Sequence, residues 1–168
     1  TSIGNDAFYI CYSLTSVVIG DSVTTIGDEA FYWCRLTSIT VSGGNANYKS
    51  IDGNLYTKDG KTLIQYAIGK TATKFTIPDS VTSIGNWAFY GCSSLTSVVI
   101  GDSVTSIGSY AFYNCTSLTK VYYKGTAEEW SHISIDSGNS SLTDTMQYYY
   151  SETQPTVDGN FWHYDENG

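Results

Sequence analysis

The sequence repeats itself every 23 residues, and this period constrains the fold more than any other feature. Ile3 and Ile26 are 23 positions apart, as are Ile84 and Ile107. The same step separates Phe8 from Phe31, Phe89 from Phe112, Cys11 from Cys34 and Cys92 from Cys115. A fixed period of roughly 20–50 residues is typical of solenoids, propellers and similar arrays, in which each repeat is one supersecondary unit.

Each unit contains strand-like segments and one turn-rich segment. Apolar residues with a strand-like pattern occur at 14–19, 36–41, 74–77, 95–100 and 118–123, and these segments predict about five coils. "VTSI" predicts a second short strand, and "SYAFYNC" predicts a short helical or irregular turn with Ala111, Phe112 and Cys115 facing inward. Because no unit can bury its apolar side alone, we expect a β-rich solenoid whose coils stack into one continuous core.

Two segments depart from the regular period. Ile26 and Ile84 are 58 positions apart, which is two periods plus 12, so an insertion is expected at about 48–73. There "NLYT" and "TLIQYA" flank Lys58-Asp59-Gly60-Lys61, and Asp-Gly is a strong signal for a β-hairpin. The sequence therefore predicts a solenoid domain at 1–123 that carries this hairpin.

The segment 124–168 is predicted to be a C-terminal cap. Thr126 followed three residues later by Glu129 predicts a helix start with a capping box. "MQYYYSET" and "GNFWHYDE" predict aromatic strands. Shielding of the last coil is the expected role of this cap, and an aromatic binding surface is the alternative.

The charge balance excludes some classes of partner. Sixteen acidic and eight basic residues give a net charge of −8, which disfavours nucleic acid and attachment to anionic lipid through a polybasic segment. No apolar run approaches the roughly 20 residues of a membrane span, so we expect no membrane insertion. The chain begins within a repeat, at "TSIGNDAFY", without a leader, as expected of a processed or trimmed fragment.

The pattern "SVTSIGxxAFxxCxSLTSVxI" resembles the BspA-type, or Treponema-type, leucine-rich repeat family of bacterial surface proteins. The resemblance covers nearly the whole chain, and the middle segment is similar to an insertion that such proteins often carry. It implies a leucine-rich-repeat-like right-handed coil at an extracellular or cell-surface location. It also implies a non-enzymatic interaction module that binds a host or cell-surface protein, such as a matrix protein, or a glycan. The alternatives are a structural spacer or display segment and, less favoured, a carbohydrate-binding or carbohydrate-active protein.

The four cysteines do not predict reactive chemistry. Stacked coils place equivalent residues roughly 4.8 Å apart along a line, whereas zinc needs four ligands arranged tetrahedrally at about 2.3 Å. Pairs such as Cys11–Cys34 fall within disulfide range, but in-register side chains point the same way and not toward each other. We therefore expect all four to be small buried core residues.

Other possible reactive or ligand-binding motifs also have simpler explanations. "IGKT" lacks the upstream glycine of a phosphate loop, since Ile64 occupies that position. Turn hydrogen bonds explain the aspartates Asp21, Asp79 and Asp102 without calcium. His132 and His163 lie outside any catalytic motif. No catalytic residue, metal or cofactor is expected.

The candidate binding residues are aromatic. A tyrosine follows the inward phenylalanine in all four regular units and is expected to face solvent: Tyr9, Tyr32, Tyr90 and Tyr113, with Trp33, Trp87 and Tyr110 beside them. Such a column can supply interface anchors, or its rings can stack on one another to cover the coil edges. A second candidate is the outer sheet face: Ser16, Val18, Ser38, Thr40, Ser97, Val99, Lys120 and Tyr122.

Overall fold

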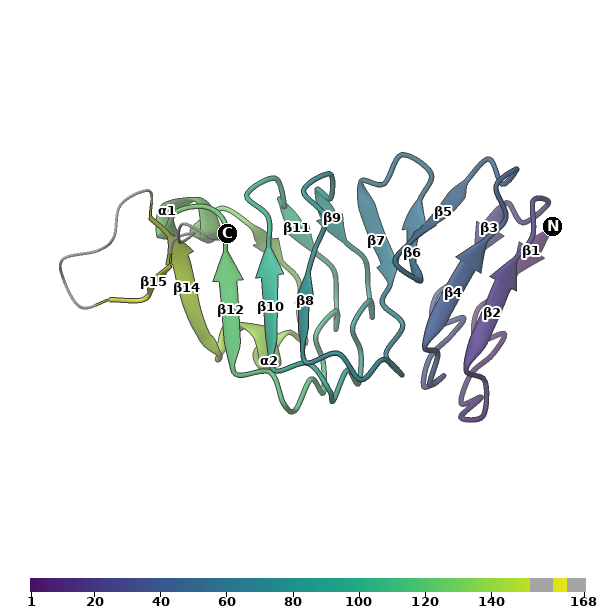
Figure 1. The fold of residues 1–168 in the computed structure, drawn as a ribbon, viewed down its shortest axis with the longest axis horizontal. Coiled ribbons are helices and arrows are strands. Elements are labelled where there is room, and N and C mark those ends of the chain that lie inside the picture. Colours follow the sequence, from purple (N-terminus) through teal and green to yellow (C-terminus); the bar gives the residue numbers. More distant parts are fainter. Residues whose placement is uncertain (152–158, 163–168) are drawn as a thin grey trace.

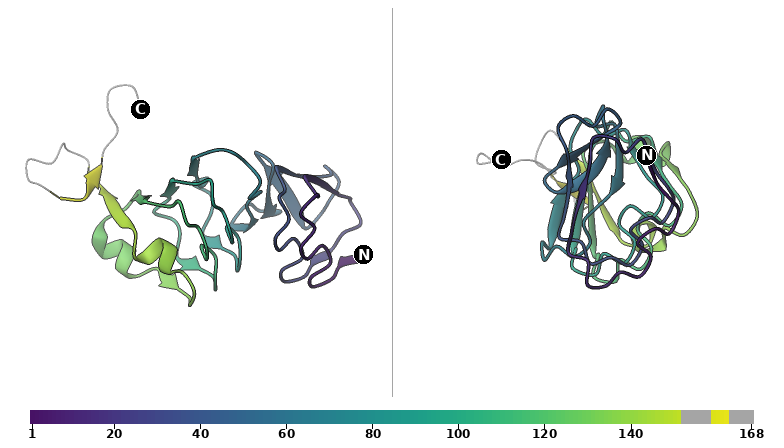
Figure 2. Two further views of the ribbon diagram at one scale, coloured as in Figure 1. Left: turned by 90° about the horizontal axis from the view of Figure 1, so that it is seen from below. Right: turned by 90° about the vertical axis from the view of Figure 1, so that its right-hand side faces the viewer.

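A computed structural model describes residues 1–151 and 159–162 and shows an elongated solenoid of about six turns (Figure 1). The solenoid fold predicted from the period is confirmed. Figure 2, right, shows the coils superimposed when the molecule is seen from its N-terminal end. One side carries the longer strands: β2 (Ser16–Ile19), β4 (Ser38–Val41), β8 (Lys74–Thr76), β10 (Ser97–Ile100), β12 (Lys120–Tyr123), β14 (Met146–Tyr150) and β15 (Phe161–Trp162).

The other side carries short strands formed by "VTSI" and its equivalents. They are β1 (Ser2–Ile3), β3 (Thr25–Ile26), β9 (Ser83–Ile84), β11 (Ser106–Ile107) and β13 (Ser134–Ile135). Successive coils pair in parallel, so that Ser97 lies opposite Lys120 and Ile84 opposite Ile107. This register stacks equivalent positions on one another, and the branched side chains at the inward positions, such as Val98 and Ile107, fill the interior.

The segment between the two sides is an irregular turn and not a helix. Counted from the glycine that follows each short strand, the third and seventh residues have a left-handed backbone in every regular unit: Asp6, Ile10, Glu29, Trp33, Trp87, Gly91, Tyr110 and Asn114. Non-glycine residues adopt this conformation at a cost of roughly 1–2 kcal/mol each. Hydrogen bonds to the next coil help offset that cost, as where the N–H of Trp87 donates to Ser109 O at 3.1 Å.

The inserted segment is a three-stranded antiparallel unit. β5 (Tyr48–Ile51), β6 (Asn54–Thr57) and β7 (Thr62–Gln65) pair in sequence order, and β7 then pairs in parallel with β9. The predicted hairpin around Lys58–Lys61 is confirmed. A second tight turn precedes it at Asp52-Gly53, whose φ values of 50° and 71° match a type I′ turn.

The insertion interrupts both sheets. β4 does not pair with β8, and β3 does not pair with β7. Instead the hairpin bonds to the preceding coil, since the N–H of Ile39 donates to Gly53 O at 2.8 Å.

The interior is divided into two hydrophobic clusters by this unit. Successive residues of a strand point to opposite faces. Accordingly, Leu55 of β6 packs in the N-terminal cluster and the adjacent Tyr56 packs in the C-terminal cluster. The expectation of one continuous core is therefore wrong, because β6 lies between the N-terminal and the C-terminal hydrophobic clusters and separates them.

The chain after residue 123 continues both sheets. α1 (Ala127–Ser131) begins with the predicted capping box: Thr126 Oγ1 accepts from the N–H of Glu129, whose carboxylate accepts from the N–H of Thr126. β13 pairs with β11, and after α2 (Ser140–Thr143) β14 pairs with β12. The domain boundary at 123/124 remains a prediction. His163 and the end of "GNFWHYDE" lie outside the described residues.

We predict that Phe89→Ala lowers the free energy of unfolding by about 3–5 kcal/mol. Phe89 is fully buried, and its ring stacks on Phe112 at 4.6 Å and on Tyr66 at 5.0 Å, so truncation leaves a cavity in the larger cluster. Urea unfolding measures the loss. Phe8→Ala, at the equivalent half-buried position of the first unit, is the matched control and should lower the free energy of unfolding by a smaller amount. A Phe89→Ala loss below about 1 kcal/mol would contradict the stacked core.

Candidate functional site

The four predicted tyrosines form one stacked column, here called the tyrosine ladder (Tyr9, Tyr32, Tyr90 and Tyr113). Tyr9 stacks on Tyr32 with centroids 5.1 Å apart, and Tyr90 stacks on Tyr113 at 5.4 Å. Tyr32 and Tyr90 meet at 4.5 Å, and the Tyr32 hydroxyl donates to the Tyr90 hydroxyl at 2.5 Å. The ladder is thus continuous across the insertion.

Further aromatic rings flank the ladder on both sides. Trp87 stacks on Tyr110 with centroids 4.4 Å apart, and the Trp33 ring meets Tyr90 edge-on at 5.9 Å. The structure adds Tyr12, which packs edge-on against Trp33 at 6.3 Å. Tyr12 lies outside the repeated "AFYxC" pattern, so the repeat gave no signal for it.

Stacking determines which part of each ring is accessible. Neighbouring rings within the coil pairs are nearly parallel, tilted by 6° for Tyr9–Tyr32 and 10° for Tyr90–Tyr113, and therefore cover one another's faces. The ladder ends are the most exposed members, at 47% for Tyr9 and 43% for Tyr113. Ring edges and hydroxyl groups consequently make up most of the accessible ladder surface.

Tyr32 and Tyr90 touch because the inserted coil has no ring at their level. Leu63 pairs with Ile84, and Tyr66 takes the phenylalanine position, since its N–H donates to Ala88 O and its ring stacks on Phe89. The next residue, Ala67, therefore occupies the tyrosine position and is too small to separate the two rings.

The inserted coil is also two residues shorter than a regular coil. A regular unit has five steps from the strand isoleucine, Ile84, to the phenylalanine, Phe89, whereas the inserted coil has three steps from Leu63 to Tyr66. The missing residues are those of the glycine turn. Between regular coils this turn packs tightly on the preceding one, since a Cβ added to Gly108 would lie 2.3 Å from Asn86 Oδ1. The equivalent glycine after the inserted coil is packed less tightly, since a Cβ added to Gly85 would have Leu63 O as its nearest atom, at 3.1 Å.

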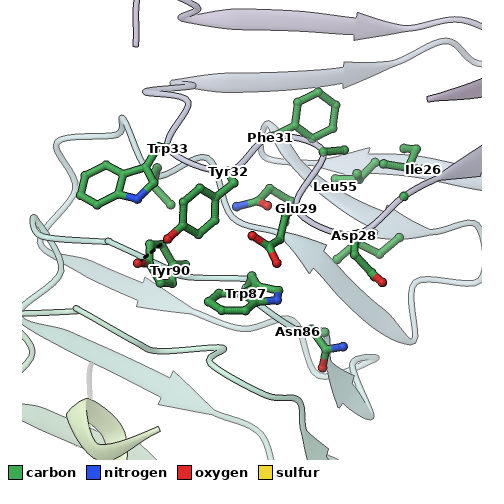
Figure 3. A pocket seen from close by; sticks show the side chains of 16 residues that line it. Ile26, Asp28, Glu29, Phe31, Tyr32, Trp33, Leu55, Asn86, Trp87 and Tyr90 are labelled. Carbon is green, nitrogen blue, oxygen red and sulfur yellow. Dashed lines mark hydrogen bonds between the residues drawn. The ribbon is translucent and has the colours of Figure 1, made fainter. Parts of the chain in front are cut away.

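A pocket of about 130 Å³ lies where that turn is missing, and we call it the junction pocket. The turns of the second and fourth units form opposite walls, with Glu29 and Tyr32 on one and Trp87 on the other, while Gln65 and Ile68 come from the inserted coil. Figure 3 shows the Glu29 carboxylate beside the rings of Tyr32 and Trp87. The pocket thus opens beside the ladder.

Glu29 has no hydrogen-bond or ion-pair partner for its carboxylate among the described residues. Partial burial raises its pKa above the usual range, and the nearby carboxylates of Asp6 and Asp28 raise it further. The junction pocket therefore combines an uncompensated acidic group with aromatic walls.

Tyr122 lies apart from the other candidate residues. It is on the outer face of the five-stranded sheet, where it stacks on Tyr148 at 5.2 Å and meets Trp162 edge-on at 5.9 Å. The repeat could not reveal this cluster, because Tyr148 and Trp162 come from the segment beyond the last regular unit.

The second candidate surface, on the outer sheet face, is not uniform. Val18 is 71% exposed, as expected, but Ser97 is only 6% exposed and does not face open solvent. The break between β4 and β8 also divides this face into two sheets.

The cysteine prediction holds for three residues of the four. Cys34, Cys92 and Cys115 are buried, and the Cys34 and Cys115 thiols donate to the carbonyls of Phe8 and Phe89 in the preceding regular coils. Cys11 is exposed, and its predicted burial is wrong for the described residues, since it lies in the first described coil and no other described coil packs on its N-terminal side.

The remaining motifs have structural roles. A Cβ on Gly69 of "IGKT" would lie 2.1 Å from Arg35 O, so glycine permits this close approach, and Lys70 Nζ contacts Asp52 O. Asp79 pairs with Lys124 at 2.6 Å. Within 1–151 and 159–162, no three His, Cys, Asp or Glu side chains are grouped to hold a metal ion. No helix of that same part is long and apolar enough to cross a membrane.

The BspA type leucine-rich repeat region matches this sequence in six copies, over residues 1–68 and 65–134. The chain therefore belongs to the BspA-type leucine-rich repeat family, as the repeat pattern suggested. No curated protein matches it.

Solved structures of bacterial repeat proteins are similar to this chain. A leucine-rich repeat protein from Eubacterium ventriosum is 31% identical with a TM-score of 0.63, over 90% of this chain and 46% of the other. A leucine-rich cell surface protein from Faecalibacterium prausnitzii is 26% identical with a TM-score of 0.62, over 82% and 55% respectively. The pneumococcal vaccine antigen PcpA shares the fold at 16% identity and a TM-score of 0.59, over 91% and 51%. The chain thus spans about half the length of these proteins.

We predict that only Cys11 reacts with a thiol reagent in the folded protein. Alkylation requires an accessible thiolate, whereas burial raises the pKa of Cys34 and Cys115 and brings that of Cys92 to about 12. Intact-mass measurement after iodoacetamide treatment at pH 8 should show one adduct, and four after unfolding in guanidinium. More than one rapid adduct on the native protein would contradict the buried thiol positions.

Proposed function

We propose that this chain is a non-enzymatic protein-interaction module that acts outside the cell or at the bacterial surface. The observation that carries the proposal is the tyrosine ladder, which joins four coils into one aromatic surface across an insertion that breaks both sheets. Tyrosine and tryptophan are enriched among the residues that dominate binding energy, since they offer a large contact area with few rotatable bonds.

The exposed geometry favours a protein over a glycan as the partner. Sugars bind aromatic residues through ring faces, and the ladder's neighbours cover most of these faces. Exposed edges and hydroxyl groups instead suit the mixed apolar and hydrogen-bonding contacts of a protein interface. A host or cell-surface protein, such as a matrix protein, is the partner that we propose. The surface location is supported by the Faecalibacterium relative, which is described as a cell surface protein.

The test compares variants for binding to a panel of matrix proteins and to a glycan array. Replacing Tyr9, Tyr32, Tyr90 and Tyr113 together by Ser should reduce protein binding by at least about tenfold, because it removes the whole ladder. The matched quadruple Phe variant keeps the rings but lacks the hydroxyl groups, and should lose less affinity than the Ser variant. Tyr122→Ser changes an aromatic residue on another face and should bind like wild type.

Three outcomes would count against this proposal. If the wild-type protein binds nothing, the alternative of a structural spacer is favoured. If the quadruple Ser variant stays folded and binds as well as wild type, the ladder is not the binding surface. If only glycans bind, the partner class is wrong. Thermal unfolding of each variant separates lost binding from lost folding.

A further inference from the structure

Between regular coils, the turn segments are joined by three backbone hydrogen bonds. From the fourth unit to the fifth, Trp87 N–H donates to Ser109 O at 3.1 Å, Phe89 N–H to Ala111 O at 2.7 Å and Gly91 N–H to Tyr113 O at 2.9 Å. The first and second units are joined in the same way, with distances of 3.1, 2.8 and 2.9 Å at the equivalent positions.

This pattern stops at the junction pocket. Among the described residues, no group accepts from the N–H of Glu29, Phe31 or Trp33, and none donates to the carbonyl of Asn86 or Tyr90. All five residues line the pocket. The turn of the second unit therefore has three unpaired backbone donors, and the turn of the fourth unit has two unpaired backbone acceptors on either side of Ala88 O, which accepts from the N–H of Tyr66.

Buried or partly buried backbone groups favour a partner, since leaving one unpaired costs free energy comparable to a lost hydrogen bond. A ligand that satisfies both walls must itself carry donors and acceptors. A peptide segment has both on every residue, and added main-chain pairing is a recurrent mode of peptide recognition.

The charge of the pocket specifies a side chain for that segment. The Glu29 carboxylate lies in the pocket beside the rings of Tyr32 and Trp87 (Figure 3), and no cationic group among the described residues pairs with it. These two rings are inclined at 81° with centroids 5.8 Å apart, and the other face of Trp87 is covered by Tyr110. A carboxylate beside aromatic faces is a favourable setting for an ammonium or guanidinium group.

We propose that the junction pocket binds a Lys or Arg residue carried on an extended segment of a partner protein. The cation lies beside Glu29 and the aromatic rings, and peptide groups of the segment pair with the free backbone groups of the two walls. The pocket measures about 130 Å³, slightly less than the roughly 150 Å³ cavity that holds benzene, and so has room for the cationic end of one side chain. The net charge of −8 adds a general attraction for basic segments.

The inference names partner chemistry for the surface proposed above, and so rests on that proposed function, but it is tested without the natural partner. The probe is the peptide acetyl-Gly-Lys-Gly-amide, titrated into the isotopically labelled protein and followed by NMR at the Trp87 indole and the Glu29 amide. We expect saturable shifts at these groups, with Arg in place of Lys acting similarly. The same peptide with norleucine, which lacks the charge, should bind at least about tenfold more weakly.

Variants of the protein locate the site. Glu29→Gln removes the charge but keeps the side-chain shape, and should weaken Lys-peptide binding by at least about tenfold. Asp102→Asn makes the same change in net charge at an exposed turn far along the sequence and should have no effect. The Glu29 carboxylate makes no hydrogen bond or ion pair among the described residues, so Glu29→Gln should keep the wild-type melting temperature, which is measured in parallel.

The inference is overturned if the Lys peptide does not bind, if norleucine serves equally well, or if Glu29→Gln binds like wild type. Equal binding of free butylammonium would also overturn it, since the site would then recognise a cation and not a peptide. Tyr32 and Tyr90 belong both to the ladder and to the pocket lining, but Glu29 is not part of the ladder, so Glu29→Gln tests the pocket separately from the ladder assay. Loss of peptide binding with an intact ladder interaction therefore removes this inference alone.

Discussion

Hydrogen bonding between successive coils is the constraint on which the rest of this structure depends. Parallel strands and turn segments pair residue by residue along the solenoid, so each coil must have the same length and shape as its neighbour. The 23-residue period meets this requirement, and it stacks phenylalanine on phenylalanine and tyrosine on tyrosine. In the first and fourth units, the left-handed residues of the turn are held in the same way, by hydrogen bonds to the next coil.

The inserted coil breaks this requirement in two places. It gains an antiparallel unit before β7, which separates the hydrophobic interior into two clusters, and it loses two residues after β7, which leaves the junction pocket. Ala67, at the tyrosine position of the same coil, is small enough for Tyr32 and Tyr90 to meet, which keeps the tyrosine ladder continuous. The proposed binding surface and the proposed peptide pocket thus both depend on the inserted coil.

The regular part of this arrangement could be predicted from the sequence, and the irregular part could not. Equal spacing identified the strands, the inward phenylalanines and the tyrosine column, because stacked coils of equal length place equivalent residues in equivalent positions. The inserted coil differs in residue type at the deciding positions: Tyr66 replaces phenylalanine and Ala67 replaces tyrosine, so its register appears only once β7 is seen to pair with β9. Asp52-Gly53 did carry a turn signal for the added strand β5. No sequence signal marked Glu29, because its proposed role depends on the two residues that are missing from the inserted coil.

Amide hydrogen exchange measures the central claim most directly, because it reports whether the coil-to-coil hydrogen bonds are interrupted at the insertion. The amides of Glu29, Phe31 and Trp33 are predicted to exchange much faster in the free protein than their equivalents Trp87, Phe89 and Gly91, which donate to the next coil. Equal protection of the two sets would contradict the account, since it would show that the inserted coil supplies the partners and that no gap separates the two walls.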